Sequence, residues 1–328
     1  MPQSGEDTRR SPRLSLKTTR RRFEVKGVVQ GVGFRPFVYN LATAHGLTGS
    51  VFNHSAGVTI EAEGGSAALA LFEEQLTSRK PPLAVIDELT STGIPPLNDT
   101  AFVILESEHA DAASTPVPPD IATCPDCLRE LLDPADRRYL YPFLNCTNCG
   151  PRFTIIQDLP YDRPATTMSN FAMCPACEAE YHDPANRRFH AQPTACPACG
   201  PQLSDSIDHI RQLLSEGKIV AVKGIGGFHL VCDATSDAAL STLRERKHRF
   251  EQPFAVIARD LAIVRRIAEV SDEEAALLES PQRPIVLLRK RESSLSSLVA
   301  PGNGYVGVML PYAPLHYLLL GETPLVMT

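Results

Sequence analysis

Eight of the nine cysteines in this chain occur in Cys-x-x-Cys pairs, and this pattern restricts the possible folds more than any other feature. The pairs form two groups with the same spacing, C-x2-C-x18-C-x2-C, offset by fifty residues: Cys124, Cys127, Cys146 and Cys149, then Cys174, Cys177, Cys196 and Cys199. Neighbouring residues repeat as well, since DPADRR at 133–138 returns as DPANRR at 183–188. The segments 124–149 and 174–199 are therefore an internal duplication.

The spacing of each group fits a zinc-binding motif. Four thiolates complete a tetrahedral site and leave no open coordination position, so we predict two structural zinc ions. Short polar segments of this kind cannot build a core of their own, and metal binding then supplies the free energy of folding. A redox role is the alternative for a Cys-x-x-Cys pair, but four pairs in two matched units favour metal. We expect each segment to bind its own ion, although ligands from both segments could share one.

The chain has 328 residues and a net charge of −6, and the charges are unevenly distributed. Residues 1–22 carry seven Arg and Lys against two acidic residues, which predicts a disordered basic leader. This leader lacks the apolar run of a secretory signal, and the chain has no stretch as apolar as a membrane span. We therefore expect a cytoplasmic protein without membrane contact. The acidic remainder argues against a nucleic-acid partner, because nucleic-acid-binding domains are usually basic.

The hydrophobic pattern divides the rest of the chain into domains. Residues 23–107 are predicted to follow the order β-α-β-β-α-β of a ferredoxin-like fold. Small and polar residues with several prolines predict a linker over 108–123. Residues 204–328 alternate predicted helices with buried strands such as PFAVIA and RPIVLLRK, as in an α/β domain. The expected fold class is α+β, with several domains.

The segment VQGVGFRPFVY, residues 28–38, places two glycines directly before an arginine and the start of a predicted helix. Glycine adopts positive φ easily and allows close approach to the backbone. N–H groups around such a turn form an anion-binding cradle, and a planar guanidinium suits phosphate oxygens. The glycine spacing alone is equally compatible with a tight turn beside a surface arginine. The residues of the predicted phosphate-binding loop are Gln30, Gly31, Val32, Gly33, Phe34 and Arg35.

The same segment resembles the signature of the acylphosphatase family, and the resemblance covers roughly residues 20–107. It implies that the loop binds an acyl phosphate and that Arg35 holds the phosphoryl oxygens. It also implies that Asn53, in GSVFN, orients the attacking water. Ala56 departs from the aspartate that is frequent in the following turn, at a position without a catalytic role.

The C-terminal part resembles the YrdC-like family through LRERKHRFEQPFAVIA and KGIGGFHLVCDA. That resemblance implies binding of ATP, with Mg, and formation of a carbamoyl adenylate. The Lys-x-Arg element of the family matches Lys247 and Arg249, and Lys223 and His229 lie on the glycine-containing strand and turn. Gln252 stands where the family usually has lysine. The Ser-Gly-Asn element of the family does not follow PLVMT, so we expect the YrdC-like domain to be incomplete.

The order of acylphosphatase-like domain, paired zinc motifs and YrdC-like domain resembles the HypF-type carbamoyltransferases of [NiFe]-hydrogenase maturation. The resemblance implies hydrolysis of carbamoyl phosphate, formation of carbamoyl-AMP from ATP, and transfer of the carbamoyl group to the C-terminal cysteine of the partner HypE for cyanide ligand synthesis. We expect this chain to keep only the acylphosphatase-type hydrolysis, because that site is self-contained, and to lack the transfer. Two alternatives stay open: an RNA-binding module built from zinc ribbons and a YrdC-like fold, and an acylphosphatase on a zinc scaffold.

Overall fold

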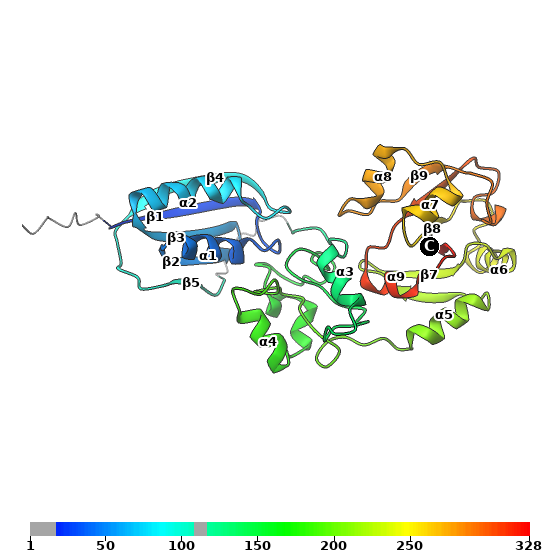
Figure 1. Cartoon of the computed structure of the whole chain (residues 1–328), viewed down its shortest axis with the longest axis horizontal. Helices are drawn as coiled ribbons and strands as arrows, with labels where there is room; N and C mark the ends of the chain where they lie inside the picture. Colours follow the sequence, from blue (N-terminus) through cyan, green and yellow to red (C-terminus); the bar gives the residue numbers. More distant parts are fainter. Residues whose placement is uncertain (1–17, 108–116) are drawn as a thin grey trace, which may run out of the picture.

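The structure is a computed structural model that describes residues 18–107 and 117–328. Figure 1 shows three parts in a row: a first sheet with two helices, a central region that holds the cysteines, and a second sheet with its own helices. The central region contacts both neighbours through hydrogen bonds. Two separate sheets with helices packed against them confirm the predicted α+β class.

The first sheet has five strands in the order β4-β1-β3-β2-β5, antiparallel except for the parallel pair β2–β5. Its core includes side chains from both helices, for example Phe72, whose ring packs edge-on against Phe23 at 5.7 Å. This is the ferredoxin-like arrangement that the sequence predicts. The elements are β1 (Thr18–Val28), α1 (Phe34–Ala44), β2 (Thr48–His54), β3 (Gly57–Gly65), α2 (Ser66–Ser78), β4 (Val85–Ile94) and β5 (Phe102–Ile104).

Strand β1 begins earlier than the sequence pattern indicates, so residues 18–22 of the predicted leader are part of the sheet. The reason is Arg20, which is 4% exposed and pairs with Glu61 at 2.7 Å, Glu63 at 3.2 Å and Asp99 at 2.6 Å. Basic residues here therefore neutralise carboxylates of β3 across the ladder, instead of forming a solvated tail. Residues 1–17 lie outside the described residues, as do 108–116 of the predicted linker.

We predict that Arg20→Ala lowers the free energy of opening of this sheet by about 3–5 kcal/mol, because it leaves the buried carboxylate of Glu63 without its cation. Burial alone would raise the pKa of Glu63, but hydrogen bonds from Leu97, Asn98 and Arg20 lower it below its ordinary value of 4.5. The stabilisation is therefore present at neutral pH and lost as the pH falls below that value. Hydrogen exchange of the β1 and β3 amides measures the change.

The matched control is Arg22→Ala, because Arg22 is half exposed and pairs with Glu61 at the surface. Arg22→Ala should lower the free energy of opening of the sheet by less than about 1 kcal/mol. Equal effects of the two substitutions on hydrogen exchange would show that burial of the Arg20 cluster does not stabilise the sheet.

The central region contains little regular structure and packs around its cysteines. Each of its two helices begins directly after the first cysteine of a repeat, with a proline at the first helical position. Buried Cys127, Cys146 and Cys149 belong to one cluster with apolar neighbours such as Leu131 and Tyr141. The helices are α3 (Pro125–Leu132) and α4 (Pro175–His182).

The second sheet has six strands in the order β6-β7-β11-β8-β10-β9, with one parallel pair, β8–β10. Helices α6, α7 and α8 contribute to one core cluster, and α5 and α9 to another. The elements are α5 (Ile207–Ser215), β6 (Val220–Lys223), β7 (Phe228–Asp233), α6 (Asp237–Lys247), β8 (Ala255–Ile257), α7 (Leu261–Ile267), α8 (Asp272–Glu279), β9 (Val286–Arg289), β10 (Tyr305–Met309), α9 (Pro314–Leu319) and β11 (Leu325–Met327).

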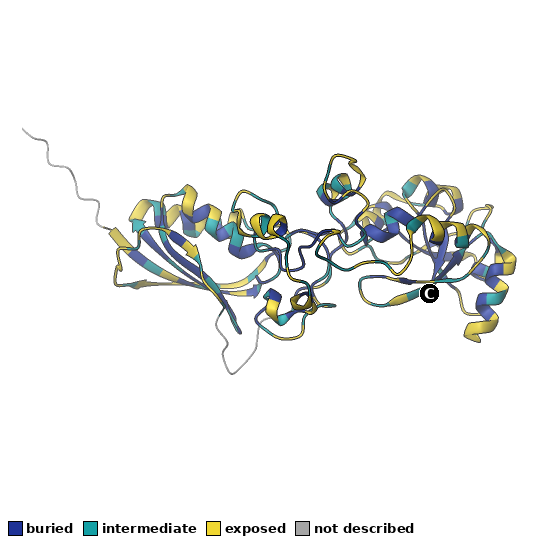
Figure 2. Cartoon of the chain, turned by 90° about the horizontal axis from the view of Figure 1, so that it is seen from below, coloured by how far each residue is buried: buried dark blue, intermediate teal, exposed yellow. Residues whose placement is uncertain are grey.

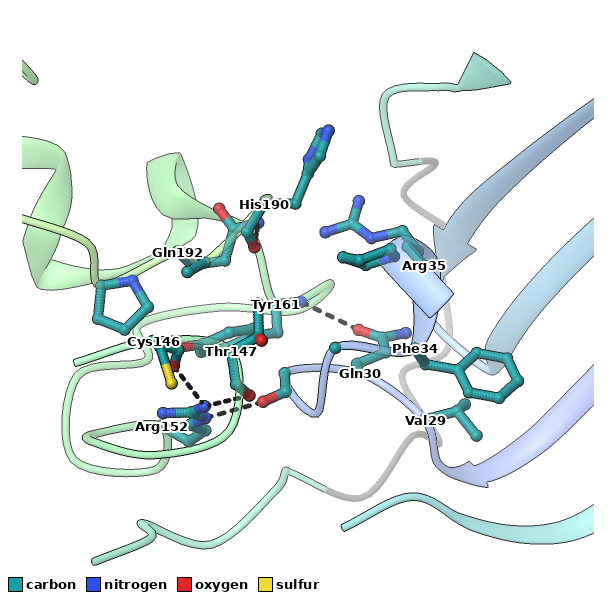
Figure 3. A pocket seen from close by; sticks show the side chains of 15 residues that line it. Val29, Gln30, Phe34, Arg35, Cys146, Thr147, Arg152, Tyr161, His190 and Gln192 are labelled. Atoms are coloured by element: carbon teal, nitrogen blue, oxygen red, sulfur yellow. Dashed lines mark hydrogen bonds between the residues drawn. The ribbon is translucent and has the colours of Figure 1, made fainter. Parts of the chain in front are cut away.

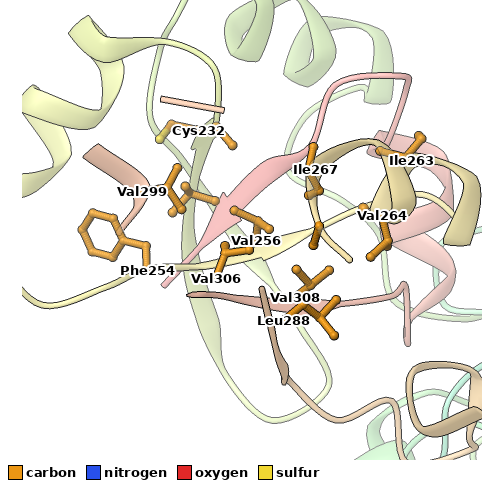
Figure 4. Close-up of a cluster of buried hydrophobic side chains, with 14 of the residues drawn as sticks. Cys232, Phe254, Val256, Ile263, Val264, Ile267, Leu288, Val299, Val306 and Val308 are labelled. Carbon is orange, nitrogen blue, oxygen red and sulfur yellow. The ribbon is translucent and has the colours of Figure 1, made fainter. Parts of the chain in front are cut away.

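Alternation along these strands separates the two clusters, because neighbouring side chains point to opposite faces of a sheet. Val256 and Val308 belong to the cluster drawn in Figure 4, whereas Ile257 and Met309 belong to the other. Cys232 is fully buried in the first cluster, and burial raises the pKa of its thiol to about 12. It therefore acts as a small apolar core residue. Figure 2 shows that the strands are largely buried, whereas the helices expose their outer faces.

Within residues 18–107 and 117–328, no helix combines the length and the apolar composition that crossing a membrane would require.

Candidate active site and metal centres

The glycine loop connects β1 to α1 and has the backbone conformation that the sequence predicts. Gly31 and Gly33 have φ values of 66° and 75°, in the left-handed region that favours glycine. A Cβ at Gly31 would also lie 2.8 Å from Cγ of Pro118 and 3.1 Å from the ring of Tyr161. Gly33 caps α1 without a side-chain hydrogen bond, so no capping side chain covers this helix N-terminus. Such an N-terminus is suited to an anion.

The structure brings Arg35 and Asn53 together, as the acylphosphatase resemblance implies. Asn53 is 1% exposed on β2, and with its amide oxygen turned toward Arg35 it accepts hydrogen bonds from Nε and Nη2, both at 3.2 Å. The side chain of Gln30 is hydrogen-bonded to the backbone instead. Its Nε2 donates to the carbonyls of His54 and Gly57, and its Oε1 accepts from the N–H of Tyr161. The side chains of Val32 and Phe34 are buried in the core of the first domain. Any contact of these three residues with an anion is therefore made through the backbone.

The pocket at the loop is not confined to the first domain, which corrects the expectation of a self-contained site. Its lining combines the loop and Arg35 with Thr147 and Arg152 from the first cysteine repeat, and with His190 and Gln192 from the second (Figure 3). Burial, followed by the nearby positive charge of Arg35, lowers the pKa of His190 to about 4, so this side chain is neutral at neutral pH.

Arg35 itself pairs with a residue of the central region. Its guanidinium donates to the carboxylate of Asp162 and to the hydroxyl of Ser107, and Ser107 also donates to Asp162. The sequence reasoning missed both residues, because neither belongs to a recognised motif.

Arg152 joins the first cysteine repeat to the glycine loop. This side chain is 2% exposed, and its Nε donates to the carbonyl of Gly31 at 2.8 Å. Its other nitrogens donate to the carbonyls of Cys146, Thr147 and Cys149 (Figure 3). A glutamine, Gln202, occupies the equivalent position in the second repeat, so this contact distinguishes the two halves of the duplication.

The eight paired cysteines form two compact sites, each made within one repeat. In the first site, the Sγ···Sγ distances for Cys124–Cys146, Cys146–Cys149 and Cys127–Cys149 are 3.7, 3.8 and 3.4 Å. Tetrahedral zinc with bonds of about 2.3 Å places its sulfurs about 3.8 Å apart. The corresponding distances in the second site are 3.6 to 3.7 Å, for Cys174–Cys196, Cys196–Cys199 and Cys177–Cys199. Both sites therefore fit zinc, and pairing within each repeat agrees with our expectation.

Each repeat supplies an arginine to the metal site of the other. Arg187 of the second repeat donates to Sγ of Cys127 at 3.2 Å, and Arg137 of the first donates to Sγ of Cys177 at 3.1 Å. The arginines are anchored by Glu130 and Glu180 respectively, two glutamates that also differ by fifty residues. Hydrogen bonds of this kind orient metal ligands and offset the negative charge of four thiolates. The repeated DPADRR and DPANRR segments thus have a reciprocal role.

We predict that metal analysis finds about two zinc ions per chain. In Arg187→Ala, the first site should lose its metal to a chelator about 10–100 times more readily, because outer-shell partners typically change metal affinity by that factor. Mass spectrometry of alkylated cysteines resolves the two sites, and Cys124 and Cys127 should react first. The control Arg129→Ala removes an exposed side chain that pairs with Asp126 on the same helix. Clearly fewer than two zinc ions in the unaltered chain, or identical alkylation in the two variants, would contradict this account.

The predicted nucleotide-site residues lie at one end of the second sheet. Lys247 and Arg249, at the end of α6, donate to Oγ1 of Thr328 at 3.1 and 3.4 Å. Lys223 ends β6, with its ammonium 5.1 Å from the ring centroid of Phe228. His229 follows on β7, and burial, followed by the charge of Lys247, lowers its pKa.

A cavity of about 450 Å³ lies next to this cluster, within the size range of small-molecule sites. It is lined by the glycine turn Gly226–Gly227, by His229 and Tyr312, which are hydrogen-bonded at 2.9 Å, and by residues 120–122 from the segment that precedes the cysteines. The cavity is therefore closed on one side by the central region.

Family models match all three parts of the chain. The model described as acylphosphatase matches residues 21–104, the HypF finger matches 123–156 and 173–204, and the Sua5/YciO/YrdC model, described as telomere recombination, matches 212–328. Carbamoyltransferase HypF2 of Cupriavidus necator is 53% identical over 95% of this chain. The chain belongs to the HypF family. Carbamoyltransferase HypF of Rhizobium leguminosarum is 56% identical over 92% of the chain.

A solved structure supports the same assignment. A full-length HypF in its phosphate- and nucleotide-bound form has a TM-score of 0.91 to this chain at 49% identity, and the match covers 95% of the chain. The match covers 43% of that structure, and 41% and 40% of the two relatives. The chain thus spans about two-fifths of the length of these HypF proteins.

Proposed function

We propose that a HypF-type carbamoyltransferase hydrolyses carbamoyl phosphate at Arg35 of this chain and joins the released carbamate to ATP near Lys247, a step for which this chain supplies part of the site. The observation that carries the proposal is the contact of Arg35 with Asn53 beside the glycine loop, in a chain about half identical to carbamoyltransferases over nearly its whole length. Transfer of the carbamoyl group to HypE is proposed for the full-length protein, and no residue of this chain is assigned to it.

Hydrolysis at the first site needs positioning and charge stabilisation, because an acyl phosphate is already activated. The loop N–H groups and the guanidinium of Arg35 bind the phosphoryl oxygens. Asn53 directs a water molecule, whose oxygen bonds to phosphorus while the bond from phosphorus to the carbamoyl oxygen breaks. Inorganic phosphate and carbamate are the products. No group with a strongly shifted pKa is required for this step.

The second site is proposed to bind ATP with Mg and to form carbamoyl-AMP. Lys247 and Arg249 neutralise phosphate oxygens of the nucleotide, a role that their convergence on Thr328 supports. Lys223 adds a third cation at the same end of the sheet. Carbamate decomposes in water, and the cavity beside His229 is a suitable place to hold it next to the nucleotide.

We predict that Arg35→Ala lowers kcat/KM for carbamoyl phosphate hydrolysis by at least about a hundredfold, because it removes the cation at the developing charge. Release of inorganic phosphate measures the rate. Arg79→Ala, which changes an exposed arginine at the end of α2, is the control and should leave the rate unchanged. Near-normal turnover by Arg35→Ala would remove the proposed site.

In the full-length protein, the second step predicts ATP–pyrophosphate exchange that depends on carbamoyl phosphate. Lys247→Ala should reduce the rate of this exchange by about tenfold or more, because the nucleotide loses one contact between a cation and a phosphate. The control is Lys218→Ala, which changes an exposed residue after α5 and should leave the rate unchanged. Exchange that does not depend on carbamoyl phosphate, or that is insensitive to Lys247, would favour the alternative of an acylphosphatase on a zinc scaffold.

A further inference from the structure

The guanidinium of Arg35 is held by an anion that the protein itself supplies. Arg35 is 8% exposed, and its partner Asp162 is 23% exposed on the segment between the two cysteine repeats. One carboxylate oxygen of Asp162 accepts from Arg35 and the other from Ser107, which also accepts from Arg35. Across the described residues, Asp162 is the ion-pair partner found for this arginine.

Three polar side chains near Arg35 are neutral, and the other cation that lines the pocket, Arg152, is held by backbone carbonyls. Asn53 accepts from its guanidinium, and His190 is uncharged at neutral pH. The amide of Gln192 is already occupied, since it accepts from the N–H of Arg163 and the hydroxyl of Tyr181 and donates to the carbonyl of His190. Asp162 is thus the group whose negative charge faces Arg35, the cation that is predicted to bind phosphate.

The space at the loop is small while this pair is formed. The cavity lined by the loop, Arg35 and His190 has a volume of about 20 Å³. A single water needs roughly 10–15 Å³ by this measure, so the enclosed space holds about one water. A phosphate that accepts hydrogen bonds from the guanidinium of Arg35 competes with the carboxylate of Asp162 for the same donors.

We propose that Asp162 is a positioning residue that competes with phosphate for Arg35. Its carboxylate keeps the guanidinium beside Asn53 between turnovers and lowers the affinity of the site for the phosphate product by like-charge repulsion. This inference rests on the proposed function, since it assigns Arg35 to phosphate binding. The effect is a faster release of product at the cost of weaker binding.

Direct titration with inorganic phosphate by calorimetry tests the proposal on the zinc-loaded chain. Asp162→Asn keeps the shape and removes the charge, so phosphate should bind about tenfold more tightly, a modest value for removal of one nearby like charge. In carbamoyl phosphate hydrolysis, KM and the inhibition constant of phosphate should fall together. Asp158→Asn changes an exposed carboxylate of the same segment and should alter neither constant.

Equal or weaker phosphate binding by Asp162→Asn, with zinc content retained, would overturn the proposal and leave Asp162 as a support for folding. Should that variant lose its zinc, Asp162→Ser carries the test, since it removes the same charge with a smaller polar side chain and should also tighten phosphate binding; no tightening would overturn the proposal. If phosphate binding behaves as predicted but the unaltered chain does not hydrolyse carbamoyl phosphate, the proposed function fails while the competition between Asp162 and phosphate stands.

Discussion

The hydrogen bonds of one buried guanidinium, that of Arg152, connect the metal-binding region to the glycine loop. The first zinc site fixes the cysteine segment, the carbonyls of that segment hold Arg152, and Arg152 holds the carbonyl of Gly31. Because a trans peptide points its C=O and N–H in opposite directions, fixing the Gly31 carbonyl also fixes the following N–H of Val32. The cysteine region is therefore part of the candidate site, and a zinc ion held there would stabilise the loop that is proposed to bind phosphate.

The duplication explains how the central region serves two purposes. The features shared by the repeats are structural: four cysteines, a glutamate and two arginines each, and the same left-handed backbone at Leu140 (φ 56°) and His190 (φ 52°). The features that differ face the pocket, since His190 and Gln192 replace Leu140 and Pro142. The same left-handed turn thus carries Leu140 and Pro142 in one copy and the pocket residues His190 and Gln192 in the other.

Local patterns made much of this molecule predictable. The glycine pair before Arg35 predicted a loop with positive φ, the cysteine spacing predicted two four-thiolate sites, and alternation predicted the buried strands of the second sheet. What the sequence could not reveal are contacts between distant segments. Asp162 is 127 residues from Arg35, and Arg152 is 121 residues from Gly31. No local periodicity encodes such pairs, and the repeated arginines were visible as a pattern while their crosswise contacts depend on the three-dimensional fold.

In the proposed mechanism, the loop amides and Arg35 together bind the phosphoryl group of an acyl phosphate, inside a pocket completed by the zinc region. A crystal structure of the zinc-loaded chain with orthophosphate tests it most directly. We expect one phosphate on the N–H groups of residues 31–35, with the guanidinium of Arg35 turned onto it and away from Asp162. A phosphate bound elsewhere, with Arg35 still paired to Asp162 and the loop amides uncontacted, would contradict the account.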